Sequence, residues 1–410
     1  CFSSPVAAAA PKGAPAKMKV AFVDFLSGPG ATFGIAGKWA TSVIVSSYNK
    51  KGGIGGVPIE VIWVDEAKGT ARVVTEFRRL VLDEKVDAIV GVTSSGNSLA
   101  IAPVADELKV LTIVHVAGTH QLQEKGRMGK GQYTFRTSNN QASDSVILAR
   151  WVMANKPNVK SIAGIQPDYS WGRDCWGAFR IAMERLQPNI KIKAELWPKL
   201  FAGEFSAEIS RLLATRADVI HTSLWGADLV TFTNQAIARG LFKQSTVLLS
   251  VGESILQLVP KVPDGTVALP RLTAGYFLDP DPKTDPAQKE FVEAFYKESG
   301  NKQYPYYAAY RTQQAWAGLK AAYEKAIDIL GRWPTTEEVI KVFEGLSYEA
   351  IGGSIVMRED HQAITGGVMG ITKFSKKHGF PILVDRQRFS AGQVTPPLGV
   401  ATLDWVRSLK

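Results

Sequence analysis

The stretch KVAFVDFLSGPGATFG, residues 19–34, sets the fold class because it joins a short apolar segment to a glycine-rich turn and then to a helix. Residues 19–26 have the β-branched and aromatic composition of a strand. Residues 35–53 predict a helix that ends at Gly52. A strand, a turn and a helix in this order form the first half of a βαβ unit, from which parallel sheets are built.

Repetition of this unit predicts an α/β fold. Further strands are expected at residues 59–67, 86–92 and 110–116, with helices at 70–85 and 98–109. After an irregular region near residues 136–141 the alternation restarts, with helices expected at 145–157, 175–187, 205–216 and 229–241 and strands at 159–167, 190–198, 218–225 and 246–253. Three more helical segments, 285–300, 309–327 and 336–346, precede short glycine-rich β-like pieces. Two Rossmann-like domains with parallel-rich sheets are the simplest interpretation.

The glycine-rich turn does not have the spacing of a nucleotide-binding turn. The dinucleotide motif G-x-G-x-x-G needs a third glycine where Phe33 stands, and Gly34 comes one position late. The pair Gly37–Lys38 also fails the phosphate-loop pattern, because Trp39 follows the lysine. No cofactor is therefore expected. Phe33 is predicted near the carboxyl ends of the strands, where ligands of open α/β sheets bind; alternatively, it only packs the first turn of its helix.

Two other loops that follow predicted strands are small and polar. TSSGNS, residues 93–98, precedes a helix, and its hydroxyls and free N–H groups suit a carboxylate. The alternative is that Ser95 or Asn97 merely caps the helix. AGTH, residues 117–120, follows the next strand and would lie beside the first loop in a parallel sheet. The two loops together predict a site for an anionic ligand.

In the second half of the chain, aromatic residues occupy the loops that follow strands. Tyr169 and Trp171 lie in PDYSWG, and Trp225 lies in LWGAD. Aromatic side chains in such loops often form the walls of a ligand site. The last strand leads into SVGES, where Glu253 is a candidate partner for a cation or an amine; the alternative is a solvated glutamate.

Composition argues against other classes of function. The chain has 410 residues, enough for two domains, and a net charge of +10 that is scattered among acids. The densest basic segment, KFSKKHG at residues 373–379, is interpreted as a solvated loop, so nucleic-acid binding is not expected. Cys1 and Cys175 do not predict a disulfide, and no closely spaced Cys and His residues predict a metal site. The motif G-x-S-x-G is absent and the five histidines have no metal-binding spacing, so no catalytic residue is predicted.

The first seventeen residues, CFSSPVAAAAPKGAPAK, have no helical or strand periodicity. The segment VAAAAP is similar to the end of a secretory signal, which predicts export. A flexible tail is one alternative, and acylation of Cys1 as a lipoprotein anchor is another. The remaining chain has no run of the roughly 18 apolar residues that a membrane-spanning helix needs, so a soluble body is expected.

Taken in order, these motifs resemble the type I periplasmic solute-binding proteins of ABC transporters, in the branched-chain amino acid and amide class that includes the Leu/Ile/Val-binding proteins. The resemblance runs from about Lys19 to the C-terminal region through LSGPGATFG, NKKGGIGG, TSSGNS, AGTH, PDYSWG and ARGL. It implies two α/β domains, joined by three crossings, that close on a ligand as hinge-bending proteins do. It divides the chain into a tail, 1–17, an N-terminal lobe, 18–137 plus 272–347, and a C-terminal lobe, 138–271 plus 348–410.

The resemblance also implies which residues bind the ligand. The carboxylate is expected at Ser95, Gly96, Val116, Gly118 and Thr119, the pocket wall at Phe33, the closing rings at Trp171 and Trp225, and the α-amine at Glu253. This chain has Phe or Trp at three positions where that family often has Tyr, so larger apolar walls replace hydroxyl contacts. Gly118 replaces a threonine of the leucine-type binders. A small carboxylate or amide with an apolar or aromatic side group is therefore expected.

The expected function is delivery of this solute to an ABC permease in the inner membrane, by a periplasmic, monomeric and non-enzymatic protein. Two alternatives stay open at this point: a ligand-sensing partner of a membrane receptor or kinase, and an enzyme on the same fold. A DNA-binding repressor is disfavoured, because the segment before the first strand is too short for a helix-turn-helix headpiece.

Overall fold

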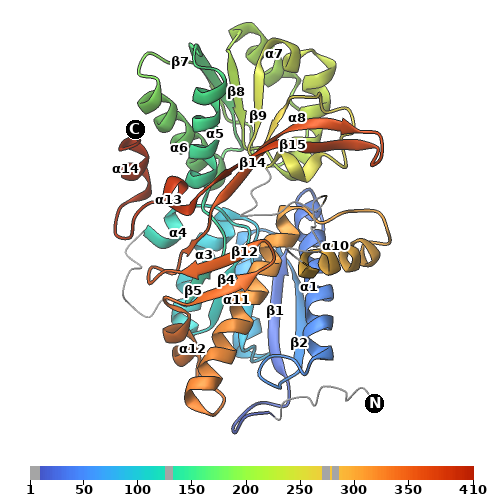
Figure 1. Cartoon of the computed structure of the whole chain (residues 1–410), viewed down its shortest axis with the longest axis vertical. Coiled ribbons are helices and arrows are strands. Elements are labelled where there is room, and N and C mark those ends of the chain that lie inside the picture. The colour runs from blue at the N-terminus through green and yellow to red at the C-terminus, as the bar shows by residue number, and fades with distance from the viewer. Residues whose placement is uncertain (1–9, 125–132, 270–277, 279–285) are drawn as a thin grey trace. The chain divides into compact units, whose positions relative to one another are not determined.

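The computed structural model describes residues 10–124, 133–269, 278 and 286–410, which belong to two compact units. The first unit comprises Cys1–Ala117, Gln121–Ser138 and Gly275–Ile364, and the second comprises Gly118–His120, Asn139–Ala274 and Thr365–Lys410. Each unit contains a parallel-rich sheet with helices, so the predicted α/β class is confirmed (Figure 1). Cys1 and the predicted boundary between residues 271 and 272 lie outside the described residues.

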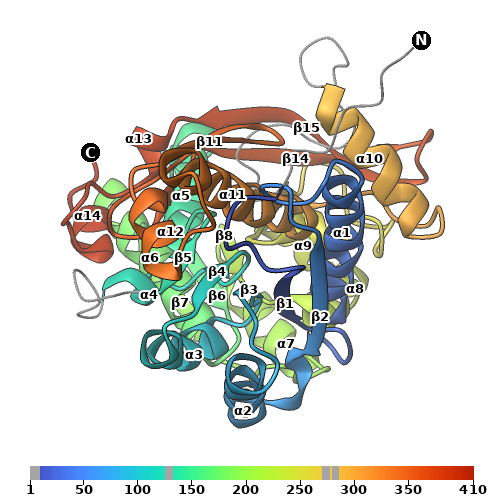
Figure 2. The same ribbon diagram turned by 90° about the horizontal axis from the view of Figure 1, so that it is seen from below.

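The sheet of the first unit has five parallel strands in the order β2-β1-β3-β4-β5. These strands are β1 (Met18–Asp24), β2 (Ile59–Asp65), β3 (Ala88–Gly91), β4 (Leu111–Val114) and β5 (Thr134–Arg136). Helices α2 (Thr70–Leu82) and α3 (Ser95–Leu108) cover one face, and α1 (Ala31–Lys50) and α11 (Tyr307–Leu330) cover the other (Figure 2). In a parallel sheet, the loops that follow all five strands lie at the same edge.

Helical periodicity explains how α2 packs on this sheet. Val73, Phe77 and Leu80 recur at the i, i+4, i+7 spacing of one helix face and are buried. They join strand residues such as Ile89 in the apolar core. Full burial of side chains of this size contributes about 1.5–3 kcal/mol each.

On the opposite face of the sheet, a side-chain hydrogen bond joins two helices. The indole Nε1 of Trp316 in α11 donates to Thr41 Oγ1 in α1 at 3.0 Å.

The sheet of the second unit has seven strands in the order β15-β14-β10-β9-β8-β6-β7. Its strands are β6 (Ser161–Ile165), β7 (Lys191–Leu196), β8 (Val219–Thr222), β9 (Thr246–Leu249), β10 (Val267–Ala268), β14 (Gly367–Ser375) and β15 (Phe380–Phe389). Strands β6 to β10 pair in parallel, and the hairpin β14–β15 adds two antiparallel strands beside β10. The predicted parallel-rich sheet is thus present, with an antiparallel edge from the C-terminal segment.

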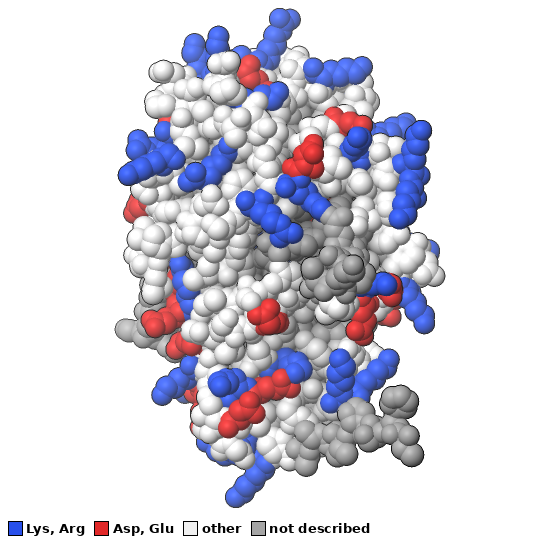
Figure 3. All heavy atoms as spheres, viewed as in Figure 1, with Lys and Arg blue, Asp and Glu red and all other residues white. Residues whose placement is uncertain are grey.

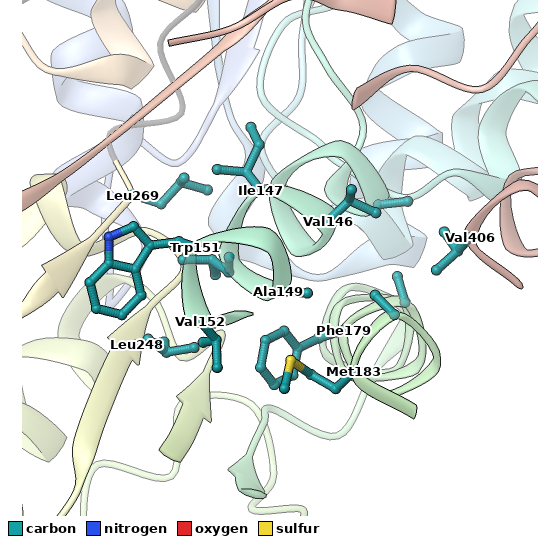
Figure 4. Packing of buried hydrophobic residues seen from close by; sticks show 14 of the residues in the cluster. Val146, Ile147, Ala149, Trp151, Val152, Phe179, Met183, Leu248, Leu269 and Val406 are labelled. Atoms are coloured by element: carbon teal, nitrogen blue, oxygen red, sulfur yellow. The ribbon is translucent and has the colours of Figure 1, made fainter. Parts of the chain in front are cut away.

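The core of the second unit lies where α5 (Gln141–Asn155) and α6 (Ser170–Leu186) meet the sheet (Figure 4). Val152, Phe179 and Met183 from the helices belong to one apolar cluster with Leu248 of β9, which lies beside Val152. The remaining elements of the unit are α7 (Ser206–Thr215), α8 (Gly226–Ala238), α9 (Leu241–Gln244), η2 (Gly252–Ile255), α13 (Ala391–Val394) and α14 (Thr402–Arg407). Val406 of α14 reaches the same core, so the C-terminal segment belongs to this unit.

Residues 348–364 pack with the first unit, whereas the expected division assigned them to the second lobe. Strands β11 (Ser347–Ala350), β12 (Gly353–Met357) and β13 (Ala363–Ile364) pair with one another in a small antiparallel sheet. Tyr348 of β11 packs on Phe343 of α12 (Thr336–Phe343). The chain leaves the unit only after this sheet is complete. The other elements of the first unit are η1 (Glu66–Lys68), α4 (Gln121–Glu124) and α10 (Pro286–Glu298).

Candidate functional site

The opening glycines bring the start of α1 close to the preceding strand. A Cβ on Gly34 would lie 2.0 Å from the carbonyl oxygen of Phe25, and a Cβ on Gly30 would lie 2.7 Å from the Phe25 ring. Gly28 has a φ of +71°, which glycine adopts without strain. Gly34 therefore allows backbone to pack on backbone, Gly30 allows backbone to pack on the Phe25 ring, and Gly28 allows the left-handed turn. These roles agree with the rejection of a phosphate-binding turn.

Phe33 forms an aromatic cluster with two residues that the sequence analysis did not single out. Its ring lies 6.3 Å from that of Tyr306 and 5.4 Å from that of Tyr307, both in edge-to-face geometry. The Tyr306 hydroxyl donates to the carbonyl oxygen of Thr32, which joins the N-terminus of α11 to the first turn of α1. Arg311 lies over the Tyr307 ring at 5.6 Å. The aromatic run YPYY before α11 was the signal in the sequence for this cluster.

The loop between β3 and α3 presents polar groups at the same edge of the sheet. Ser94 is the N-cap of α3, and its side chain accepts from the backbone N–H of Asn97. Ser95 and Gly96 are the first two helical residues, whose N–H groups have no partner within the helix. Within the described part of the chain, the buried Ser95 Oγ has no hydrogen-bond partner. A buried hydroxyl without a partner at a helix N-terminus is suited to an anionic ligand.

The alternative that Ser95 or Asn97 caps this helix is wrong, because the N-cap residue is Ser94. The observed helix starts at Ser95, three residues earlier than predicted, so the cap moves to the preceding serine. Val116 follows β4 in the neighbouring loop and is 3% exposed. The N–H of Ala117 donates to the carbonyl oxygen of Val92 at 3.0 Å, which ties this loop to the one after β3. Ala117, the first residue of AGTH, thus lies beside the loop after β3, whereas Gly118–His120 belong to the second unit.

A fully buried carboxylate, Glu66, lies under the β3–α3 loop. It accepts hydrogen bonds from the N–H groups of Thr93 and Ser94, both at 2.8 Å, and from Asn97 Nδ2 at 2.9 Å. Burial first, and the neighbouring charge of Asp24 second, raise the pKa of Glu66 to about 8, while these hydrogen bonds act in the opposite direction. The sequence analysis missed Glu66, because an acid after a strand is most simply a solvated residue.

In the second unit, Trp171 is held by a chain of polar side chains. Its Nε1 donates to the carbonyl oxygen of Ser223 at 2.8 Å, and Ser223 N and Oγ donate to Gln166 Oε1 at 2.8 and 2.6 Å. Gln166 Nε2 lies 2.9 Å from His221 Nδ1, and His221 Nε2 lies 2.8 Å from Ser250 Oγ. This series of hydrogen bonds fixes the position of the Trp171 ring. His221 is therefore a fully buried histidine whose two ring nitrogens both have hydrogen-bond partners.

Acidification should destabilise the second unit through His221. Burial lowers the pKa of His221 to about 3. In the unfolded chain the same side chain titrates near ~6.5. Between these values the unfolded chain binds a proton that the fold excludes, so the free energy of unfolding should fall as the pH drops below the unfolded value. Chemical denaturation as a function of pH measures this.

The substitution His221→Gln should flatten that decline, while His378→Gln, in the turn between β14 and β15, should leave most of it in place. An equal acid dependence in wild type and His221→Gln would show that other groups cause it.

The other candidate residues of the second unit occupy separate loops. Trp225 is the N-cap residue of α8, is 4% exposed, and packs edge-to-face on Phe201 with ring centroids 4.9 Å apart. Glu253 lies in η2 and is 2% exposed, so the alternative of a solvated glutamate does not hold. Thr119 Oγ1 donates to Asp174 Oδ2 at 2.5 Å, and Gly118 accepts from the backbone N–H of Gln141 at 2.8 Å.

The predicted site residues divide between the two units. The first unit contains Phe33, Ser95, Gly96 and Val116, and the second contains Gly118, Thr119, Trp171, Trp225 and Glu253. The expected division had placed Gly118 and Thr119 in the N-terminal lobe, whereas they pack with the second unit.

Charge and metal-binding groups outside this set are unremarkable. On the face drawn in Figure 3, Lys and Arg side chains are spread over the surface with acidic side chains among them. Among the described residues, no three His, Cys, Asp or Glu side chains are grouped in a way that could hold a metal ion. None of the helices in the described ranges has the length and apolar character needed to cross a membrane.

Two Rossmann-like units with polar and aromatic loops after their strands define a two-lobed binding protein. The profile of the family described as periplasmic binding protein matches residues 17–378, and this chain belongs to that family. The family consists of periplasmic solute-binding proteins and not of enzymes.

Relatives with established names support the same assignment. The leucine-specific-binding protein of Salmonella typhimurium is 26% identical over 305 residues, which cover 73% of this chain and 78% of that protein. An amino acid binding protein of Pseudomonas aeruginosa is 26% identical over 197 residues, 48% of this chain. This chain spans about half the length of two of these relatives. The alignment covers 50% of the Pseudomonas aeruginosa protein and 54% of a Leu/Ile/Val-binding protein homologue from Brucella melitensis.

Solved structures share the fold over almost the whole chain. A solute-binding protein of an ABC transporter from Rhodopseudomonas palustris BisB5, in complex with 3,4-dihydroxybenzoic acid, has a TM-score of 0.80 at 23% identity and covers 93% of this chain and 99% of its own. A second solute-binding protein from R. palustris, in complex with benzoate, has a TM-score of 0.77 at 18% identity and covers 93% and 100%.

Proposed function

We propose that this chain captures a small carboxylate with an apolar or aromatic side group and delivers it to an ABC permease. The observation that carries the proposal is the buried Ser95 hydroxyl, which has no partner in the described part of the chain and stands at the N-terminus of α3. The dipole of α3 and the N–H groups of Ser95 and Gly96 would stabilise the negative charge of the ligand. Val116, in the adjoining loop, would complete this anionic subsite.

Aromatic residues would supply the walls of the site. Phe33 brings Tyr306 and Tyr307 with it in the first unit, and Trp171 and Trp225 stand at loops of the second. Flat rings favour a planar or apolar ligand body through stacking and edge-to-face contacts. The benzoates named in the complexes of the R. palustris neighbours fit this composition, and so does the side chain of a branched amino acid, the ligand class named for the curated relatives.

An amine on the ligand would meet an acceptor in the second unit. The buried Glu253 carboxylate is the group with the required chemistry. The ligand would first bind the donors of the first unit and then recruit the second, and contacts made only in the closed state would drive closure. Export to the periplasm, with or without acylation of Cys1, belongs to the same proposal.

Thermal unfolding in the presence of matched ligands tests this function. Benzoate, 4-hydroxybenzoate, leucine and phenylalanine form the carboxylate panel, and benzyl alcohol and leucinol are the controls that lack the carboxylate. At a hundredfold excess over its Kd, a true ligand should add about 2.7 kcal/mol to the free energy of unfolding. Native mass spectrometry of the purified protein would reveal a co-purified solute. If no carboxylate, amino acid or amide stabilised the protein, the proposed function would be wrong.

A further inference from the structure

The buried glutamate below the proposed anionic subsite determines which N–H groups of the β3–α3 loop remain available. Glu66 Oε2 accepts from the N–H of Thr93, and Oε1 accepts from the N–H of Ser94 and from Asn97 Nδ2. The carboxyl group of Glu66 therefore occupies the two N–H groups that precede the helix. The next two, those of Ser95 and Gly96, are not engaged by Glu66.

We propose that Glu66 positions the loop that binds the ligand carboxylate and that its charge state controls how tightly that carboxylate is held. The inference rests on the proposed function. It adds a residue that touches no ligand but acts on the ligand through the loop. The Glu66 carboxyl group accepts three hydrogen bonds that hold the loop. In this conformation the N–H groups of Ser95 and Gly96, which Glu66 does not engage, would meet the ligand together with the Ser95 hydroxyl.

The second part of the proposal follows from the distance between charges. Glu66 Oε1 lies 2.8 Å from the backbone nitrogen of Ser94. The expected ligand donor Ser95 is the next residue, and consecutive Cα atoms are about 3.8 Å apart. A ligand carboxylate at Ser95 would thus lie within several ångströms of Glu66. Two carboxylates at such a separation in a buried site disfavour each other's ionised form. An ionised Glu66 should weaken ligand binding, and a protonated Glu66 should permit it.

Burial and a neighbouring like charge favour the protonated form of Glu66, against the effect of the three hydrogen bonds that it accepts. Asp24, at the end of β1, is buried and carries the nearest like charge; it lies 2.9 Å from His115 Nε2, at the end of β4. From α3 the facing group is the neutral Asn97 amide, whose Oδ1 accepts from the Thr70 hydroxyl of α2 at 2.6 Å. Burial and Asp24 raise the pKa of Glu66 to about 8, so a shift in its charge falls within an accessible pH range.

The expected sign of the pH dependence follows directly. Below the pKa of Glu66 the side chain is neutral and an anionic ligand binds without repulsion. Above it the carboxylate is ionised and repels an anionic ligand. A bound anion should therefore raise the pKa of Glu66. For each unit of this rise, the affinity at high pH should be roughly tenfold lower than at low pH. Benzoate is the suitable probe, because it has no amine or phenol that titrates in the same range.

The experiment compares wild type with Glu66→Gln and with Glu60→Gln, a matched control on the exposed side of β2. Isothermal titration with benzoate and with phenylacetate at about pH 6.5 and about pH 9.5 should show tighter binding at the lower pH in wild type and Glu60→Gln. Glu66→Gln, which cannot ionise, should bind with the same affinity at both. An unchanged pH profile in Glu66→Gln would overturn the charge control.

Two measurements without ligand keep the proposal testable if Glu66→Gln is destabilised or if neither probe binds. Infrared spectroscopy of the wild-type protein should show a buried protonated carboxyl band that is lost as the pH rises through about 8 and is absent in Glu66→Gln. Hydrogen exchange should show protected amides at Thr93 and Ser94 that become exposed in Glu66→Ala. If the carboxyl band and the amide protection were both absent, the role of Glu66 would be refuted. If both were present but neither benzoate nor phenylacetate bound, the result would count against the proposed function alone.

Discussion

Replacing Gly34 by alanine should destabilise the first unit by roughly 3 kcal/mol, because the new methyl group has no space. The added Cβ would lie 2.0 Å from the carbonyl oxygen of Phe25 and 2.6 Å from its backbone nitrogen. Both atoms belong to the backbone at the end of β1, so a side-chain rotation cannot relieve the overlap. The start of α1 would have to move away from the sheet, and Phe33 would move with it. Chemical denaturation followed by circular dichroism measures the loss.

The same substitution at Gly177 is the matched control. Gly177 lies inside α6, where a Cβ would meet no atom within 4 Å. Alanine has the higher helix propensity, so Gly177→Ala should raise the free energy of unfolding by up to about 1 kcal/mol. Two Gly→Ala changes of opposite sign would show that close backbone packing, and not helix propensity, requires a glycine at position 34. Equal stability of Gly34→Ala and wild type would contradict the observed packing of the opening turn.

Replacing Ser95 by alanine should weaken ligand binding by about 10- to 100-fold, the value of a hydrogen bond to a charged group. The unliganded protein should be as stable as wild type or slightly more stable. A buried hydroxyl without a partner is costly to keep, and within the described residues Ser95 Oγ has none. Titration calorimetry with the carboxylate that stabilises the protein most, together with denaturation of the unliganded protein, measures both effects.

Ser98→Ala provides the comparison on the same helix. Ser98 Oγ already donates to the carbonyl oxygen of Ser95 at 2.8 Å and is buried. Its removal should cost about 1 kcal/mol of stability and leave the affinity within about twofold of wild type. The two serines should thus separate binding from stability. If Ser95→Ala bound its ligand as tightly as wild type, the anionic subsite would have to lie elsewhere.

The alternation of strands and helices could be predicted because it depends on short-range pattern. The predicted strand at residues 59–67 became Ile59–Asp65, and the predicted helix at 70–85 became Thr70–Leu82. Loops after parallel strands share one edge of a sheet, so the proximity of TSSGNS and Ala117, the first residue of AGTH, also followed from topology. Element ends were less predictable, because helix starts depend on which residue caps the first N–H groups, as Ser94 does for α3.

Other parts of the candidate site could not be predicted, because they depend on contacts between residues far apart in the chain. Tyr306 is 273 positions beyond Phe33, and only folding brings the N-terminus of α11 against that of α1. Residues 348–364 were assigned to the other lobe, since a glycine-rich β-like segment does not reveal which sheet it joins. Burial of Glu66 is likewise a property of packing.

The sequence by itself determined the fold class, the rejection of a nucleotide-binding turn and the family, because periodicity, glycine spacing and motif order are all local properties of the chain. Only the tertiary structure decided what the glycines of FLSGPGATFG are for and which groups of the β3–α3 loop are left for a ligand. The reason is physical: a hydrogen-bond donor is available only when no other group has taken it, and Glu66 takes Thr93 and Ser94 but not Ser95.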